Sequence, residues 1–167
     1  MSKIKNLVFS ALLTIGAFGA VTFTACNTDE CKDVVCNNGG ACISGTCSCT
    51  SGYEGNNCET QSRAKFQKNW NVNETPRIAN PYTCLIAAGT NIRDVAIAST
   101  FANSFFNNPI TGTVDGNTLT IPVQKPDVNG NYNVQGTLTF ANGQLSSSYT
   151  ITNTLTASTI VVTGTWQ

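Results

Sequence analysis

The 167-residue sequence contains no histidine, and only 11% of its residues are charged. Without histidine, neither a serine–histidine hydrolase nor a histidine-ligated metal centre is expected. The formal charges balance to zero, so no basic surface indicates a nucleic acid as a partner. The second half also has little Glu, Lys, Ala or Leu. It is rich instead in Thr, Asn, Ser and Gly, which favours strands and turns over helices.

Residues 1–25 have the pattern of a signal peptide. Lys3 and Lys5 provide a positive N-terminal region, and the stretch 7–21 is mostly apolar and carries no charge. A transmembrane helix is one alternative, but the stretch is short, contains glycine and is followed by no basic flank. Ordinary cleavage that leaves Cys26 as a free thiol is a second alternative.

The signal ends in Phe23-Thr24-Ala25-Cys26, which resembles the lipobox of bacterial lipoproteins, with Phe23 in place of the usual leucine. The resemblance implies cleavage before Cys26 and attachment of acyl chains such as palmitate to its thiol. Several acyl chains anchor a protein durably, because each buried methylene contributes about 0.8 kcal/mol. The expected membrane contact is therefore this N-terminal lipid.

Residues 26–30 form a short tether that contains Asp29 and Glu30. Acidic residues at this place resemble the surface-export signals of Bacteroidota lipoproteins, which implies a surface-exposed position on the outer membrane. A solvated tether on the periplasmic face is the alternative. Asn27, Asp29 and Glu30 also resemble part of a calcium-binding pattern that precedes some EGF-like modules. Calcium needs several oxygen ligands, and the acidic cluster expected after Cys42 is missing, so no cofactor is expected and calcium is a weaker alternative.

Six of the eight cysteines lie between Cys31 and Cys58, which indicates an oxidising compartment. A segment this short cannot bury enough apolar surface to fold unaided, so cross-links must replace a core. Spacing alone leaves many pairings open. A zinc site is not expected, because the sequence has neither a C-x-x-C pair nor a histidine.

The stretch 49–58 matches the EGF signature C-x-x-G-aromatic-x-G-x-x-C, and 38–42 looks like the N-G-G-x-C segment of the same family. Residues 31–58 therefore resemble an EGF-like domain, with Gly52, Tyr53 and Gly55 as its signature residues. The two signature glycines are expected to adopt backbone angles that other residues rarely adopt. The resemblance implies the disulfide pairs Cys31–Cys42, Cys36–Cys47 and Cys49–Cys58.

Residues 59–63 are interpreted as a linker and 64–167 as a second, all-β domain. Apolar and hydroxyl residues alternate along it, and Asp-Gly and Asn-Gly turns interrupt the alternation. We expect about eight strands in an antiparallel meander whose first strand, 64–74, pairs with the last, 159–166, to close a β-barrel. The pattern resembles the lipocalin-like barrels of Bacteroidota lipoproteins. A β-sandwich is the alternative, whereas an outer-membrane barrel is not expected without an apolar outer band.

The alternation also predicts which side chains share a face of each strand. The predicted sets are Val95, Ile97, Ser99 and Phe101; Leu119, Ile121 and Val123; Tyr132, Val134, Gly136, Leu138 and Phe140; and Ile160, Val162, Gly164 and Trp166. The Asn142-Gly143 turn leads into a further strand, Leu145 to Ile151.

Few residues of this domain suggest chemistry. Cys84 is interpreted as a buried strand thiol. Trp70 and Trp166 are interpreted as core residues, with stacking on a sugar as the alternative. Glu74 and Asp94 are the best candidates for a glycosidase pair, but nothing in the sequence marks them for that role.

The sequence thus predicts a noncatalytic envelope lipoprotein that binds a protein or a glycan. A lipocalin-like carrier or inhibitor of a small apolar ligand is the alternative, and a cavity lined by Val95, Leu119, Val134 and Leu138 would favour it. An interior filled by side chains would favour the first hypothesis. A third hypothesis, an envelope hydrolase, requires a cleft that gathers Glu74 or Asp94 with a second acid.

Overall fold

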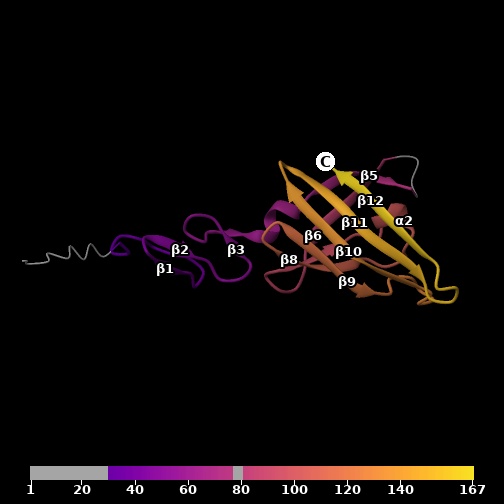
Figure 1. Cartoon of the computed structure of the whole chain (residues 1–167), viewed down its shortest axis with the longest axis horizontal. Helices are drawn as coiled ribbons and strands as arrows, with labels where there is room; N and C mark the ends of the chain where they lie inside the picture. Colours follow the sequence, from indigo (N-terminus) through magenta and orange to yellow (C-terminus); the bar gives the residue numbers. More distant parts are fainter. Residues whose placement is uncertain (1–29, 77–80) are drawn as a thin grey trace, which may run out of the picture.

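The structure is a computed structural model that describes residues 30–76 and 81–167. The signal peptide, the lipidation candidate Cys26 and the calcium candidates Asn27 and Asp29 lie outside the described residues. The described chain is mainly β, with a small disulfide-rich module at one end and a barrel at the other (Figure 1). No helix in the described part of the chain is long and apolar enough to cross a bilayer.

The disulfide-rich module contains two short hairpins. Strand β1 (Ala41–Ile43) pairs with β2 (Thr46–Ser48), and β3 (Tyr53–Glu54) pairs with β4 (Thr60–Gln61). Strands of two or three residues bury little apolar surface. Cys58, which is fully buried, shows that disulfide sulfur takes the place of an apolar core here.

A short 3-10 helix, η1 (Ser62–Phe66), connects the module to the barrel. The first barrel strand therefore begins at Asn69 and not at 64, because η1 turns the chain and buries Phe66. The indole N–H of Trp70 donates a 2.7 Å hydrogen bond to the Phe66 carbonyl, which fixes the end of η1. The expected linker, 59–63, contains β4 and the start of η1, so this connection is structured.

Eight antiparallel strands form a closed barrel in which each strand pairs with its neighbours in sequence and the last pairs with the first. This arrangement confirms the predicted fold class and excludes the sandwich. Closure also leaves no strand edge open for pairing with another chain. The strands are β5 (Asn69–Thr75), β6 (Tyr82–Ala88), β7 (Asp94–Ile97), β8 (Ile110–Asp115), β9 (Thr118–Gln124), β10 (Tyr132–Ala141), β11 (Gln144–Asn153) and β12 (Thr159–Trp166).

The barrel interior is filled by side chains. Val95, Leu119, Val134 and Leu138, the residues expected to line a ligand cavity, all have 0% exposure and belong to one hydrophobic core. Because their exposure is zero, no water-sized space touches them. Each large apolar side chain buried in this way contributes about 1.5–3 kcal/mol to folding.

One predicted face is wrong at Val123, which is 62% exposed although Leu119 and Ile121 are buried. The pairing of β10 with β9 shifts register between Val134 and Gly136. Such a bulge inserts an extra residue and reverses the alternation beyond it. Val123 therefore points away from the core.

A second predicted face is wrong beyond Ile97, where β7 ends, so Ser99 and Phe101 do not continue that strand. Phe101 begins the short segment α2 (Phe101–Ser104), in which Ala102 has a φ of 52°. This left-handed turn still directs Phe101 into the core, where its ring centroid lies 4.6 Å from that of Tyr149.

Candidate functional site

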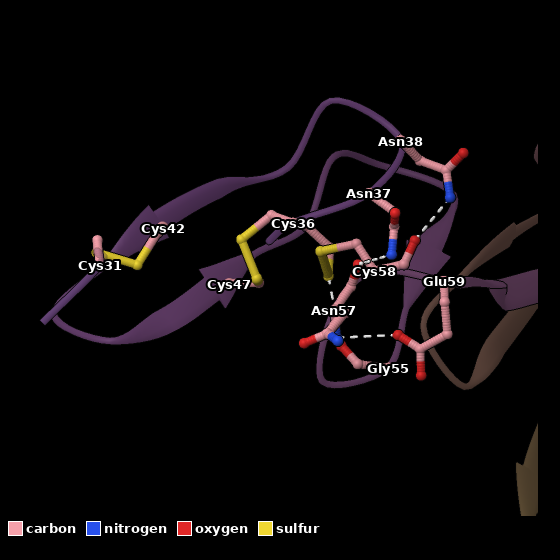
Figure 2. The surroundings of a disulfide bond; sticks show 11 residues. Cys31, Cys36, Asn37, Asn38, Cys42, Cys47, Gly55, Asn57, Cys58 and Glu59 are labelled. Carbon is pink, nitrogen blue, oxygen red and sulfur yellow. Dashed lines mark hydrogen bonds between the residues drawn. A yellow bond between two sulfur atoms is a disulfide. The ribbon is translucent and has the colours of Figure 1, made fainter. Parts of the chain in front are cut away.

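Three disulfides lie in series along the module (Figure 2). They join Cys31 to Cys42, Cys36 to Cys47 and Cys49 to Cys58, which is the pairing that the EGF-like resemblance implies. The two signature glycines, Gly52 and Gly55, have φ values of +96° and +99°, so both adopt the left-handed conformation that favours glycine. Each bridge is expected to contribute about 2–4 kcal/mol.

Two asparagines connect the first loop of the module to its last loop (Figure 2). The Asn38 amide donates a 2.8 Å hydrogen bond to the Cys58 carbonyl, and the Asn37 amide donates one of 3.1 Å to the Asn57 carbonyl. The Glu59 carboxylate accepts a 2.9 Å bond from the Asn57 backbone N–H. These contacts fix the end of the module that faces the barrel.

No group of three or more potential metal-binding side chains is found among residues 30–76 and 81–167. Glu30 is the calcium candidate that the structure describes, and its backbone lies against Gly45 in the β1–β2 turn. Asn27 and Asp29 lie outside the described part, so calcium binding stays a prediction.

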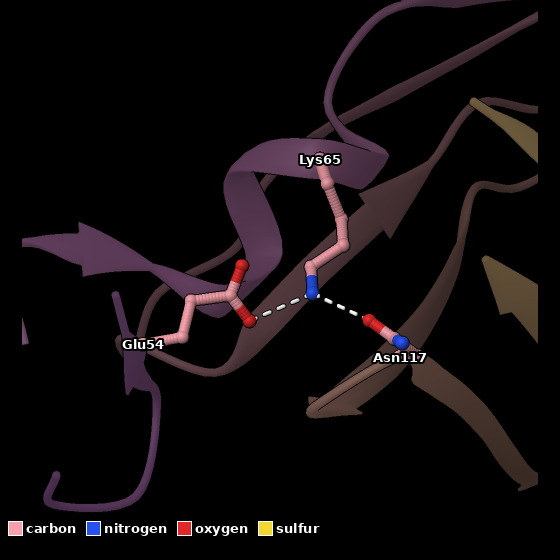
Figure 3. A network of polar contacts seen from close by, with 3 residues as sticks. All are labelled: Glu54, Lys65 and Asn117. Carbon is pink, nitrogen blue, oxygen red and sulfur yellow. Dashed lines mark hydrogen bonds and ion pairs between the residues drawn. The ribbon is translucent and has the colours of Figure 1, made fainter. Parts of the chain in front are cut away.

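Lys65 links the module to the barrel (Figure 3). Its ammonium group lies 2.7 Å from a carboxylate oxygen of Glu54 in β3 and 2.7 Å from the side-chain oxygen of Asn117 in the β8–β9 turn. Since Lys65 itself belongs to η1, one side chain connects three segments.

Arg63 makes a second set of junction contacts. Its Nη1 donates to the carbonyl oxygens of Gly89, Asn91 and Asp94, at 3.1, 2.6 and 3.0 Å. All three belong to the β6–β7 turn or its flanks, and Gly52 of the module packs beside the same turn, against Ile92. The module is therefore fixed to the barrel by polar contacts and close packing.

Glu74 is a charged residue inside the barrel, with 1% exposure. Tyr82 and Tyr149 each donate a 2.7 Å hydrogen bond to its Oε2, and Ser147 and Trp166 each donate one of 3.2 Å to its Oε1. The carboxylate thus accepts four bonds from residues on β6, β11 and β12. Charge-assisted hydrogen bonds of this kind compensate for the loss of hydration.

Glu74 and Asp94, the candidates for a glycosidase pair, make separate structural contacts. The Asp94 carboxylate caps the β6–β7 turn by accepting a bond from the backbone N–H of Asn91, whereas the Glu74 carboxylate accepts its four bonds inside the barrel. The Tyr82 hydroxyl also accepts a 3.0 Å bond from the Ala102 N–H. Burial and the neighbouring Glu74 charge raise the pKa of Tyr82. This cluster ties the β7–β8 connection to the barrel wall.

Cys84 is free and fully buried, as predicted from the sequence. Burial raises the pKa of its thiol to about 11, and the charge of Glu74 acts in the same direction, against a hydrogen bond from Thr100. Trp70 and Trp166 have 0% exposure, so both are core residues and neither offers a face to a sugar. No surface nucleophile or stacking platform arises from these three residues.

The outer surface of the barrel carries two cross-strand rows of uncharged polar side chains, which together we call the hydroxyl face. The first row crosses six neighbouring strands, from β8 through β12 to β5, and the second crosses five, from β9 through β12 to β5. The first row is Thr113, Thr120, Thr137, Ser148, Thr163 and Thr75, and the second is Thr118, Thr139, Ser146, Thr165 and Asn73.

The hydroxyl face was not foreseen from the sequence. A signal for it is present, because residues 128–167 contain no charged side chain. Two shallow grooves cross the face. One, of about 410 Å³, lies over β9, β10 and β11, and the other, of about 420 Å³, lies over β5, β11 and β12.

No protein-family model matches the chain, and no curated protein matches it. The protein is therefore classified here by its fold. It is a small module with three disulfides joined to a closed eight-stranded antiparallel barrel.

Proposed function

We propose that the protein is a noncatalytic lipoprotein, anchored through Cys26 in the outer membrane, that presents its barrel for contact with a protein or a glycan. The observation that carries this proposal is the fixed junction, in which Arg63 and Lys65 bind the disulfide-rich module to the barrel turns. A rigid module between an anchor and a barrel acts as a spacer that holds the barrel away from the lipid.

The filled interior supports contact through the outer surface. A carrier needs space inside the barrel, and Val95 and Leu119 leave none beside them. A hydrolase needs a cleft with two acids, and Glu74 has its bonds within the barrel wall while Asp94 caps a turn. The outer strands and loops are the remaining surfaces for a partner.

The proposal is tested in cells that express the full chain and its Cys26→Ala variant, fed with an alkyne analogue of palmitate. We expect the wild-type protein to be labelled and the variant to be unlabelled. Proteinase K added to intact cells is expected to digest the wild-type barrel. Retention of the label by Cys26→Ala, or recovery of unlabelled wild-type protein in the soluble fraction, would contradict the anchor. Protection from the protease would place the protein on the periplasmic face.

A further inference from the structure

We infer that the hydroxyl face binds uncharged polysaccharide. This inference rests on the proposed function and narrows its partner from a protein or a glycan to one chemical class. It is carried by the juxtaposition of two regular hydroxyl rows with two shallow grooves on the side of the barrel.

The rows form a regular array because they follow the sheet register. Thr137 pairs with Thr120 on one side and with Ser148 on the other, and Ser148 pairs with Thr163. Neighbouring strands lie about 4.8 Å apart. Each hydroxyl offers one donor and two acceptor lone pairs, which is the same hydrogen-bonding capacity as a sugar hydroxyl. The array therefore suits a ligand that itself carries hydroxyls at short, repeated intervals.

Neither groove is lined by a charged residue, which favours a neutral ligand. Beyond the two rows the register continues to Asp94, opposite Thr113, and to Asp115, opposite Thr118, at the β7 and β8 side of the face. A charged side chain in the contact would have to lose water without gaining an opposite charge, which is costly. The hydroxyl face avoids this cost, since every member of both rows is Thr, Ser or Asn. Thr also presents a methyl group, which can contact the apolar C–H surface of a sugar ring.

The grooves lie along the rows. The β9–β11 groove is lined by Thr120, Thr137 and Ser148 among others, and the β5–β12 groove by Thr75 and Thr163 among others. All five belong to the first row. A flexible polymer can therefore lie along this row and occupy both grooves at once. Several weak contacts on one chain then add up to useful avidity.

The opposite side of the barrel lacks these rows. There the outward pairs are mixed in character: Thr83 of β6 lies opposite Asn71 of β5, and Leu85, which is 42% exposed, lies opposite Asn69. Ala87 of β6 lies opposite Ala96 of β7. Cross-strand Thr pairs stabilise any sheet by about 0.2–1 kcal/mol, but that effect alone would not confine them to one side. Thr83, an exposed threonine on β6, provides a matched control outside the hydroxyl face.

The test is affinity electrophoresis of the full lipidated protein, purified in a non-ionic detergent. Native gels contain one dissolved polysaccharide each: galactomannan, mixed-linkage β-glucan, xyloglucan or α-mannan, with polygalacturonate as the anionic control. Migration is compared with that of the same variant in a gel without polymer. We expect at least one neutral polymer, and not polygalacturonate, to retard the wild-type protein.

Thr137→Lys is expected to weaken this retardation at least tenfold in apparent affinity, while Thr83→Lys leaves it unchanged. Thr137→Val, which removes the hydroxyl but suits a strand, is expected to weaken it about threefold. No retardation by the neutral polymers, equal retardation by polygalacturonate, or equal loss in both Lys variants would overturn the inference.

Light scattering on the same samples tests whether the hydroxyl face is instead a contact between copies of the chain. If Thr137→Lys converts a dimer to a monomer and no polymer retards the wild type, the face is a contact between copies and the inference is wrong. If no neutral polymer retards the wild-type protein but Cys26 is still labelled, the inference of polysaccharide binding is wrong and the proposed function is unaffected.

Discussion

The indole N–H of Trp166 donates a 3.2 Å hydrogen bond to Oε1 of Glu74, so the last barrel strand is tied to the first by a buried polar contact. Backbone pairing of Trp166 with Val72 closes the same seam. Tyr149 on β11 donates to the other carboxylate oxygen. Glu74 therefore connects strands that lie at opposite ends of the barrel sequence.

Glu74→Ala is expected to lower the free energy of unfolding by about 3 kcal/mol or more, because three buried donors and one partly buried donor lose their acceptor. Glu74→Gln keeps one acceptor oxygen and is expected to cost less. Guanidinium unfolding followed by tryptophan fluorescence measures both. Thr83→Ala, on the outer side of β6, is the control. Equal unfolding midpoints for Glu74→Ala and the control would refute the role given to this carboxylate.

Stability is expected to fall as the pH rises from about 9 to about 11. The pKa of Cys84 is raised from 9.0 to about 11 in the folded protein. The unfolded thiol therefore loses its proton first, and the unfolded state gains stability as the pH rises. The full effect of Cys84 is about 3 kcal/mol.

Urea unfolding of wild type and Cys84→Ala between pH 8 and pH 11 measures this dependence. The stability of the variant is expected to decline less steeply with pH. Tyr82, whose pKa is also raised, lowers the stability of both proteins alike at pH values above the ordinary tyrosine pKa. Parallel declines would show that the Cys84 thiol is not responsible.

The junction contacts are expected to make the module and the barrel tumble as one body. Backbone ¹⁵N relaxation should give the same correlation time for both parts in the wild type. Arg63→Ala, which removes the bonds to Gly89, Asn91 and Asp94, is expected to shorten the correlation time of the module.

Lys65→Met is expected to act in the same direction with less effect. It removes one partly exposed ion pair, which contributes at most about 1 kcal/mol. Lys125→Met, on an exposed loop residue, is the matched control and should leave both correlation times equal. Separate tumbling of the two parts in the wild type would contradict the spacer role.

Gly136→Ala is expected to destabilise the barrel by about 3 kcal/mol or more. A Cβ atom at this position would lie 2.3 Å from Cβ of Tyr149 on the paired strand. Gly116→Ala is the control, because its Cβ would meet nothing within 4 Å and its cost is limited to backbone strain at a φ of +53°. Thermal unfolding of both variants measures the difference, and similar melting temperatures would refute the steric argument.

The barrel was predictable because alternation and turn residues are local signals. Asp115-Gly116 and Asn142-Gly143 mark the β8–β9 and β10–β11 turns, and the strands on either side alternate as expected except at the end of β9. Val123 was assigned to the wrong face because the bulge is a property of the pairing between β9 and β10. A one-residue shift in pairing reverses every side chain beyond it.

The candidate sites were harder to predict because they depend on closure. Glu74 is buried by residues up to 92 positions away, such as Trp166, and no local pattern indicates this. The hydroxyl face needs the register of several strand pairs at once, of which Thr120–Thr137 is one. By contrast, the resemblance of residues 31–58 to an EGF-like domain implies the three cysteine pairs that the structure contains.

The serial disulfides of the module also limit how far it can be stretched. A pull between Cys31 and Cys58 divides between two covalent paths as far as Cys47: the bridge Cys31–Cys42 followed by the backbone to Cys47, and the backbone to Cys36 followed by the bridge Cys36–Cys47. From Cys49 the load crosses the bridge to Cys58. The bridges span Cα–Cα distances of only 5.8 and 5.3 Å, so at about 3.5 Å per residue the loops 31–42 and 49–58 withhold roughly 60 Å of extension. Under tension between a surface and a bound polymer, the module would lengthen very little.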